Sequence, residues 1–147
     1  MTYNEVYRYL MQVRLIDKRI WLTTVEHAEL QSCLLPAAIT YDKDVVQTSP
    51  EDKMADIAGK VVELEHKIRR LNSTKARLIV QIRNEIGQIE DEDQRVVLSA
   101  FFLAKQSMRD IADGTCRSIS GVYTIRRKGI LALRTILENK MCKLCNL

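Results

Sequence analysis

The feature of this sequence that most constrains its fold is a long seam of apolar residues between Pro50 and Glu90. The seam residues stand alternately three and four positions apart, the heptad a/d pattern of a coiled coil, held over about five repeats. They are Met54, Ile57, Val61, Leu64, Ile68, Leu71, Lys75, Leu78, Ile82, Glu85 and Ile89. A helix of this span is roughly 60 Å long and needs a partner, because most helical stability comes from packing of the apolar face. The sequence therefore predicts an all-α protein organised around long helices.

The start of the chain offers one partner for the seam. Thr2 and Glu5 have the spacing of a capping box. The apolar residues that follow at helical spacing are Val6, Leu10, Val13, Ile16 and Ile20. We expect a helix from about Tyr3 to about Leu34, followed by a connector over residues 36–50. Folded back on the seam, this helix completes an antiparallel, coiled-coil-like hairpin over residues 1–90.

A second copy of the chain is an alternative partner for the seam. Lys75 and Glu85 are polar seam positions, and such residues set the register or oligomeric state of coiled coils at a cost in stability. We favour the hairpin within one chain and expect, in addition, a homo-oligomer formed through the long helices.

The last third of the chain predicts a compact helical domain over residues 91–137. Its first helix starts at the acidic cluster Glu90 to Asp93, where negative charge suits a helix N-terminus. This helix reaches about Leu103. Its core candidates are Val97, Leu98, Phe101 and Phe102.

Residues 107–136 then have the spacing of a helix-turn-helix. Ser107 and Asp110 form a capping box for a short helix, Gly114 ends it, and Ser118 caps a longer second helix. The apolar face of this second helix is Val122, Ile125, Gly129, Leu133 and Ile136. A plain helical hairpin fits the spacing equally well. We expect residues 138–147 to form an irregular tail.

Charge distinguishes this motif from the rest of the chain. The net charge is +4, and between Ala104 and Thr135 seven basic residues stand against two acidic ones. Such a concentration is typical of phosphate contacts, although a solvated basic surface has the same composition. Arginines would position the motif on phosphates, while polar residues of the second helix reach base edges. The predicted DNA-binding residues are Arg109, Arg117, Ser118, Ser120, Tyr123, Thr124, Arg126, Arg127 and Lys128.

Three strings carry a resemblance to a known family: YLMQVRLIDKRI, VVQTSPEDKM and RDIADGTCRSISGVYTIRRKGIL. They are similar to small phage and prophage proteins of Gram-positive bacteria whose C-terminal helix-turn-helix is like region four of sigma factors, related to late-gene transcriptional regulators of the ArpU and RinA type. The resemblance implies a transcription-related DNA-binding protein, a regulator that reads promoter DNA with the second helix of the motif, and it leaves contact with RNA polymerase as an open alternative. Thr115, Arg117 and Gly129 depart from the family pattern, and Gly129 lowers helix propensity by about 1 kcal/mol against Ala.

Two alternative functions remain open. The hairpin could be a protein-interaction adaptor with a structural helix-turn-helix, or the chain could be a phage DNA recogniser like a small terminase subunit. We find no catalytic motif and predict neither an enzyme nor a cofactor. Cys142 and Cys145 are a weak zinc candidate, since they supply half of a tetrahedral site. We expect no membrane segment and a cytoplasmic location in a bacterial host.

Overall fold

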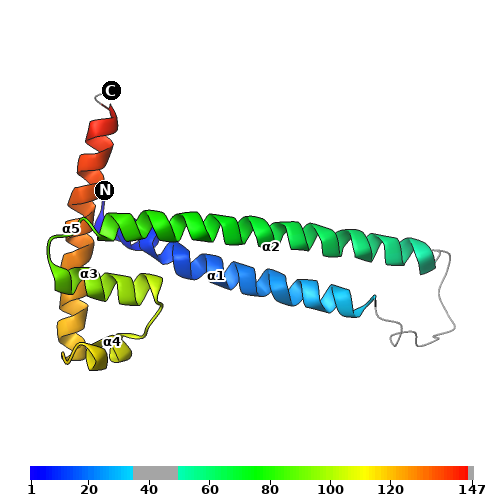
Figure 1. The fold of residues 1–147 in the computed structure, drawn as a ribbon, viewed down its shortest axis with the longest axis horizontal. Helices are drawn as coiled ribbons and strands as arrows, with labels where there is room; N and C mark the ends of the chain where they lie inside the picture. The colour runs from blue at the N-terminus through cyan, green and yellow to red at the C-terminus, as the bar shows by residue number, and fades with distance from the viewer. Residues whose placement is uncertain (35–49, 146–147) are drawn as a thin grey trace. The chain divides into compact units, whose positions relative to one another are not determined.

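The computed structural model describes residues 1–34 and 50–145, and after Met1 and Thr2 these residues form helices and the short segments that follow them (Figure 1). The elements in chain order are α1 (Tyr3–Ser32), α2 (Pro50–Ile86), α3 (Glu92–Leu98), the π-helical turn η2 (Ser99–Leu103), α4 (Met108–Gly114) and α5 (Ile119–Cys145). The prediction of an all-α protein is confirmed. The predicted connector over residues 36–50 lies outside the described residues up to Pro50, where α2 begins. No described helix has both the length and the apolar character to span a membrane.

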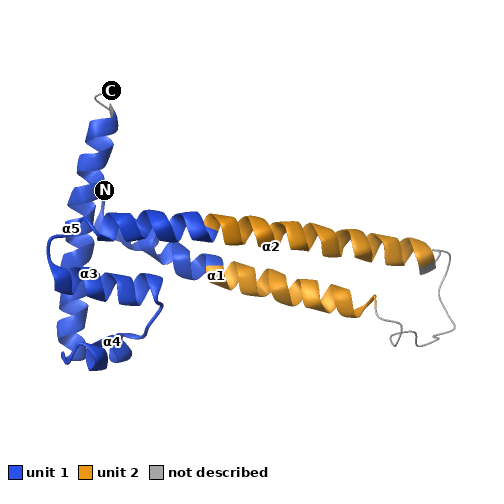
Figure 2. Cartoon of the chain, in the orientation of Figure 1, with its two compact units in different colours: residues 1–16, 75–147 blue, residues 17–74 orange. Residues whose placement is uncertain are grey.

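The chain forms two compact units, coloured separately in Figure 2. Unit 1 contains residues 1–16 and 75–147, so the start of α1 and the end of α2 belong with α3, α4 and α5. Unit 2 contains residues 17–74, the remaining parts of the two long helices. The predicted domains, residues 1–90 and 91–137, are a different partition of the chain and stay a prediction.

The core of unit 1 gathers side chains from every helix in it. Phe102 is fully buried and meets Phe101 edge to face, with 4.9 Å between the ring centroids. Each such aromatic contributes about 1.5–3 kcal/mol through burial. The other buried members of this cluster are Val6, Leu10, Val13, Ile82, Ile86, Ile89, Val97, Leu98, Met108, Ile111, Ala112, Val122, Ile130, Leu133 and Leu137. All four core residues predicted for the third helix are therefore buried.

In unit 2 the heptad seam of α2 forms the less exposed side of the helix. Val61 on the seam is 7% exposed, whereas its neighbour Val62, off the seam, is 49% exposed. The imidazole Nε2 of His27 on α1 lies 3.2 Å from Oε1 of Glu65 on α2, which joins the two helices within this unit. Met54, the first predicted seam residue, is exposed.

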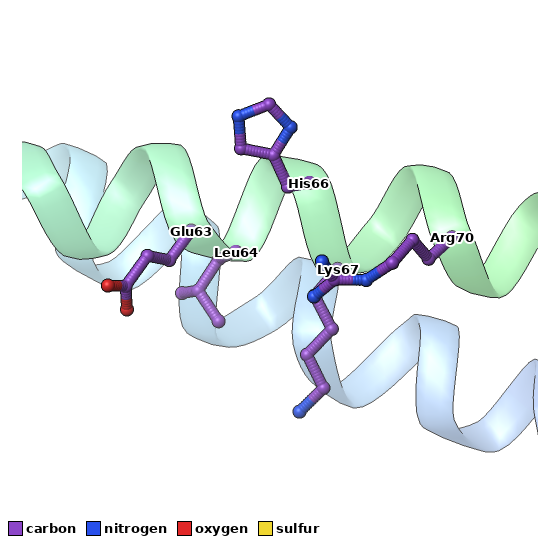
Figure 3. Close-up of a pocket in the computed structure, with 5 residues that line it drawn as sticks. All are labelled: Glu63, Leu64, His66, Lys67 and Arg70. Carbon is purple, nitrogen blue, oxygen red and sulfur yellow. The ribbon is translucent and has the colours of Figure 1, made fainter.

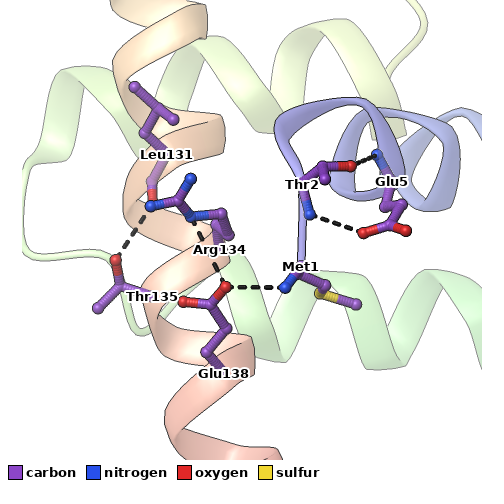
Figure 4. Close-up of polar contacts among 7 residues, drawn as sticks. All are labelled: Met1, Thr2, Glu5, Leu131, Arg134, Thr135 and Glu138. Atoms are coloured by element: carbon purple, nitrogen blue, oxygen red, sulfur yellow. Dashed lines mark hydrogen bonds and ion pairs between the residues drawn. The ribbon is translucent and has the colours of Figure 1, made fainter.

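The N-terminal capping box of α1 forms as predicted (Figure 4). The backbone N–H of Thr2 donates to the Glu5 carboxylate at 2.6 Å, and the Glu5 N–H donates to the Thr2 hydroxyl at 3.3 Å. The hydrogen bond from the Thr2 backbone holds the pKa of Glu5 below its ordinary value. The box satisfies two backbone donors that a helix N-terminus leaves unpaired.

The expected irregular tail is wrong over most of its length, because α5 continues to Cys145. Leu137 is buried in the core, and the ammonium of Lys140 lies 3.3 Å from the Glu85 carboxylate of α2. Residues 138–145 also contain neither Gly nor Pro. Tertiary contacts beyond residue 136 thus extend the helix past the point where its apolar periodicity weakens.

Candidate nucleic-acid interface

The candidate interface is built on α4 and α5 of unit 1, and the capping box of α4 sets where the first of them begins. The Asp110 N–H donates to the Ser107 hydroxyl oxygen at 3.1 Å, and that hydroxyl donates to the Asp110 carboxylate at 2.6 Å. The predicted box is confirmed. It starts α4 with Met108, Ile111 and Ala112 buried.

The turn between the helices is tight and uses a left-handed residue. Gly114 is the last residue of α4, and the Arg117 N–H then donates to the Ala112 carbonyl at 3.0 Å. Cys116, rather than the glycine, has a positive φ of 52°. Such a conformation is unfavourable for a residue with a Cβ. Thr115, a departure from the family pattern, donates its hydroxyl to the Ile111 carbonyl at 2.6 Å.

The start of α5 is capped by Ser118 as predicted, since its hydroxyl oxygen accepts the Gly121 N–H at 3.1 Å. From there Val122, Ile130 and Leu133 are fully buried. These three side chains fix which side of α5 faces the core, so the opposite side is presented to solvent.

Gly129 lets α5 approach α3 closely. A Cβ at this position would lie 3.0 Å from Cδ1 of Leu98 and 3.3 Å from Cβ of Gln94, tighter than ordinary van der Waals contact. The sequence predicts only that Gly129 lowers the helix propensity of α5. The structure adds that the missing side chain lets α5 and α3 cross closely, which a larger residue at this position would obstruct.

The solvent-facing side of α5 carries most of the predicted DNA-binding residues. Ser120, Tyr123, Thr124, Arg127 and Lys128 are all exposed, and at helical spacing they share one face. The Thr124 hydroxyl donates to the Ser120 carbonyl at 3.0 Å. This face therefore presents hydroxyl groups and two cations side by side.

Arg126 differs from the other predicted residues because it points into the protein. Its guanidinium carbon lies 4.8 Å from the ring centroid of Phe101, 4.9 Å from Tyr123 and 5.7 Å from Tyr7. Its Nη1 is also 3.8 Å from the Met108 sulfur. These are cation–π and packing contacts, so the structure does not bring Arg126 together with the outward cations.

Two further predicted residues lie outside α5. Arg109 on α4 is exposed. Arg117 in the turn is exposed too, but its guanidinium pairs with the carboxylate of Asp93 on α3. A phosphate would compete with Asp93 for Arg117. Arg109 is therefore the better candidate of the two for a phosphate contact.

Arg14 is a positioning residue that the sequence pattern did not reveal. Its Nε donates to the Phe101 carbonyl at 3.1 Å and its Nη2 to the Gln106 carbonyl at 3.0 Å, while the guanidinium lies 4.2 Å from the Phe101 ring centroid. These bonds tie α1 to the segment that leads into α4. In the sequence, only its position directly after the buried Val13, within the string YLMQVRLIDKRI, could have indicated this role.

A hollow lined by side chains of both charges lies on α2 in unit 2 (Figure 3). It is lined by Glu63, Leu64, His66, Lys67 and Arg70. Figure 3 shows His66 on the opposite side of the helix from Lys67. The residues do not converge on one point, so we assign no chemistry to this hollow.

The structure also bears on the weak zinc candidate. Cys142 is exposed and free, while the side chain of Cys145 lies outside what the structure describes. Among the described residues no three His, Cys, Asp or Glu side chains gather closely enough to hold a metal ion.

Comparison with known proteins identifies a matching family whose function is unknown. Residues 37–134 match the family model described as "Protein of unknown function (DUF1492)". The matched region includes α4 and the first half of α5, and thus the whole candidate interface. No curated protein and no solved structure matches the chain.

Proposed function

We propose that this chain, which belongs to the DUF1492 family of proteins of unknown function, binds double-stranded DNA with the outward face of α5. The observation that carries the proposal is the sorting of side chains around α5. Val122, Ile130 and Leu133 are fully buried on one side, and Arg127 and Lys128 are exposed on the other. An amphipathic helix with a polar, cationic outer face is what a helix-turn-helix places in the major groove.

In this proposal α4 and α5 are the two helices of the helix-turn-helix, and their residues contact different parts of the DNA. Arg127 and Lys128 reach guanine edges or nearby phosphates, and the hydroxyls of Ser120 and Thr124 contact bases. Arg109 contacts a phosphate and fixes the register of the motif on the duplex. The backbone N–H groups at the start of α5, next to Ser118, add a favourable dipole for a phosphate.

Arg126 supports the interface indirectly. Its guanidinium lies 4.9 Å from the Tyr123 ring, and Tyr123 is 47% exposed on the same helix. The cation–π contact holds this ring in place beside the polar face. We therefore assign Tyr123 to the interface and Arg126 to its support.

We further propose that the DNA bound is promoter DNA and that the protein regulates transcription. The resemblance of the α4–α5 sequence to sigma region four supports this role, and it also makes RNA polymerase a candidate partner. A protein-interaction adaptor is the competing function, in which the long helices bind a partner and α5 plays no part in binding DNA.

The test is fluorescence anisotropy of a labelled duplex from the region upstream of the gene, with the full chain and an Arg127→Glu/Lys128→Glu variant. We expect reversal of two cations to weaken binding at least about tenfold and to lower the dependence of log K on log salt by about two. Thermal unfolding of both proteins checks that the exposed substitutions leave the fold intact.

The matched control is Lys67→Glu/Arg70→Glu on α2, which changes the net charge by the same amount at exposed positions. We expect its affinity for DNA to stay within about threefold of the original. Equal weakening by both variants would mean that overall charge, rather than the α5 face, governs binding. Absence of binding at low salt would refute the proposal.

A further inference from the structure

Unit 2 exposes a second apolar seam on α1, on the side opposite the one that packs on α2. Ile20 and His27 are half-buried and Thr23 is buried on the packed side. On the other side Leu22 is 53% exposed and Val25 is 39% exposed. The neighbouring Trp21 is 67% exposed. Large apolar side chains gathered in this way mark an interaction surface more often than a plain solvated face.

The exposed seam has heptad spacing of its own. Lys18, Leu22, Val25 and Glu29 follow one another at steps of four, three and four residues, and all four are exposed. This is the a/d spacing of a helix that packs against another helix. Its centre is apolar and its two ends are charged.

The order of the charges along α1 indicates which helix fits. Basic residues, Lys18 and Arg19, precede the apolar centre, and acidic residues, Glu26 and Glu29, follow it. A surface with opposite charges at its two ends is complementary to itself when reversed, which is the requirement of a two-fold interface between identical chains.

We propose that this seam is a dimer interface that takes the same seam of a second copy of the chain, with the two α1 helices antiparallel. In an antiparallel coiled coil, a positions pack against d positions of the partner, so Leu22 meets the partner's Val25. The same register sets Lys18 opposite the partner's Glu29 and Arg19 beside the partner's Glu26. Two-fold symmetry repeats each of these pairs.

A parallel arrangement of the two helices is disfavoured by the same charges. It would set Lys18 beside the partner's Lys18 and Glu29 beside the partner's Glu29, and like charges at this distance repel. The charge order therefore specifies the antiparallel orientation, while the apolar centre supplies the burial that stabilises the dimer.

This dimer is independent of DNA binding. The seam lies within residues 17–74, whereas the outward face of α5 belongs to unit 1. A failed dimerisation test leaves the DNA proposal standing, and a failed DNA test leaves the dimer standing.

The first test is the mass of the full chain by sedimentation velocity, from roughly 1 μM upward over a hundredfold range of concentration. We expect the original chain to dimerise and Leu22→Asp to raise the dissociation constant about a hundredfold, since a charge would then lie at the centre of the interface. Val62→Asp is the matched control because Val62 is 49% exposed on α2, outside the seam. It should dimerise as the original does.

The second test uses charge complementation. Lys18→Glu places like charges opposite one another twice in the homodimer, and Glu29→Lys does the same, so each variant should dimerise about tenfold more weakly. Mixing the two restores both opposite-charge pairs. We expect a heterodimer in the mixture, and a homodimer again for the double variant Lys18→Glu/Glu29→Lys.

Three results would overturn the proposal: a monomeric original chain, a Leu22→Asp variant as dimeric as the original, or single-charge variants that fail to form the heterodimer when mixed. Circular dichroism of each variant separates weakened association from lost folding, since all substituted side chains are exposed.

Discussion

The hydroxyl of Tyr9 on α1 donates a 2.6 Å hydrogen bond to the carboxylate of Glu85 on α2. Glu85 is only 2% exposed, and its other carboxylate oxygen lies 3.3 Å from the ammonium of Lys140 on α5. Gln81 adds a donor to the Tyr9 oxygen at 2.9 Å. One acidic seam residue thus links α1, α2 and α5 within unit 1.

Replacing Tyr9 by Phe should lower the free energy of unfolding by about 1–3 kcal/mol, because a buried carboxylate loses a donor. Urea denaturation followed by circular dichroism measures this change. Tyr123→Phe, at an exposed ring, should stay within about 0.5 kcal/mol of the original. Equal stability of the Tyr9→Phe variant would show that the Tyr9 hydrogen bond contributes nothing net.

The same contact makes stability depend on alkaline pH. Burial and the Glu85 carboxylate raise the pKa of Tyr9 above its ordinary value of 10.0, because both disfavour the phenolate. The stabilisation is fully present below that value and declines as the pH rises above it, where the unfolded chain ionises more readily. Ultraviolet titration should show a late tyrosine ionisation that the Tyr9→Phe variant lacks. A stability that falls equally steeply in both proteins would contradict this assignment.

Gly129→Ala should destabilise the protein although Ala favours a helix by about 1 kcal/mol. The added methyl would lie 3.1 Å from Cγ of the buried Leu98, and overpacking of this kind costs about 1–3 kcal/mol. Gly59→Ala is the control, since Gly59 lies within α2 and a Cβ there meets nothing within 4 Å. Thermal unfolding should shift downward for the first variant and upward for the second. A higher unfolding temperature for both variants would mean that the Leu98 side chain moves to accommodate the added methyl group without a loss of stability.

Ser107→Ala should lower stability by about 1 kcal/mol, because it removes the cap of α4. Ser73→Ala, at an exposed position inside α2, should be neutral or slightly stabilising. Hydrogen exchange of the amides at the start of α4 provides a local measure, and it should accelerate at Asp110. Unchanged exchange there would show that α4 is held by its buried residues alone.

Arg126→Ala should mainly lower stability, whereas Arg127→Ala should mainly weaken DNA binding. Loss of Arg126 removes contacts with three aromatic rings and should cost about 1–2 kcal/mol of stability. Loss of Arg127 should leave stability within about 0.5 kcal/mol and weaken DNA binding several-fold. Paired measurements of unfolding and DNA anisotropy check both. A reversed pattern would place Arg126, rather than Arg127, at the interface.

Local features of the fold were predictable because their causes lie within a few residues of sequence. The capping boxes at Thr2 and Ser107 follow from a hydroxyl and a carboxylate three positions apart. The burial of Val61 and exposure of Val62 follow from helical periodicity. The same periodicity predicts which side of α5 carries Ser120 and Lys128.

The sequence by itself therefore determined that the chain is helical, where its capped helices start and which faces they bury, but not how far α5 extends. The tertiary structure decided what each buried face meets. Arg126 and Arg127 are adjacent and chemically identical, yet one lies among aromatic rings from α1 and η2 and the other is exposed. In the sequence alone, Gly129 and Glu85 are expected to destabilise their helices. In the structure, Gly129 allows a close approach to Leu98, and the Glu85 carboxylate accepts a hydrogen bond from Tyr9. Periodicity along one helix determines the direction in which each side chain points around the helix axis. Which side chain it meets in that direction depends on contacts between residues far apart in the chain.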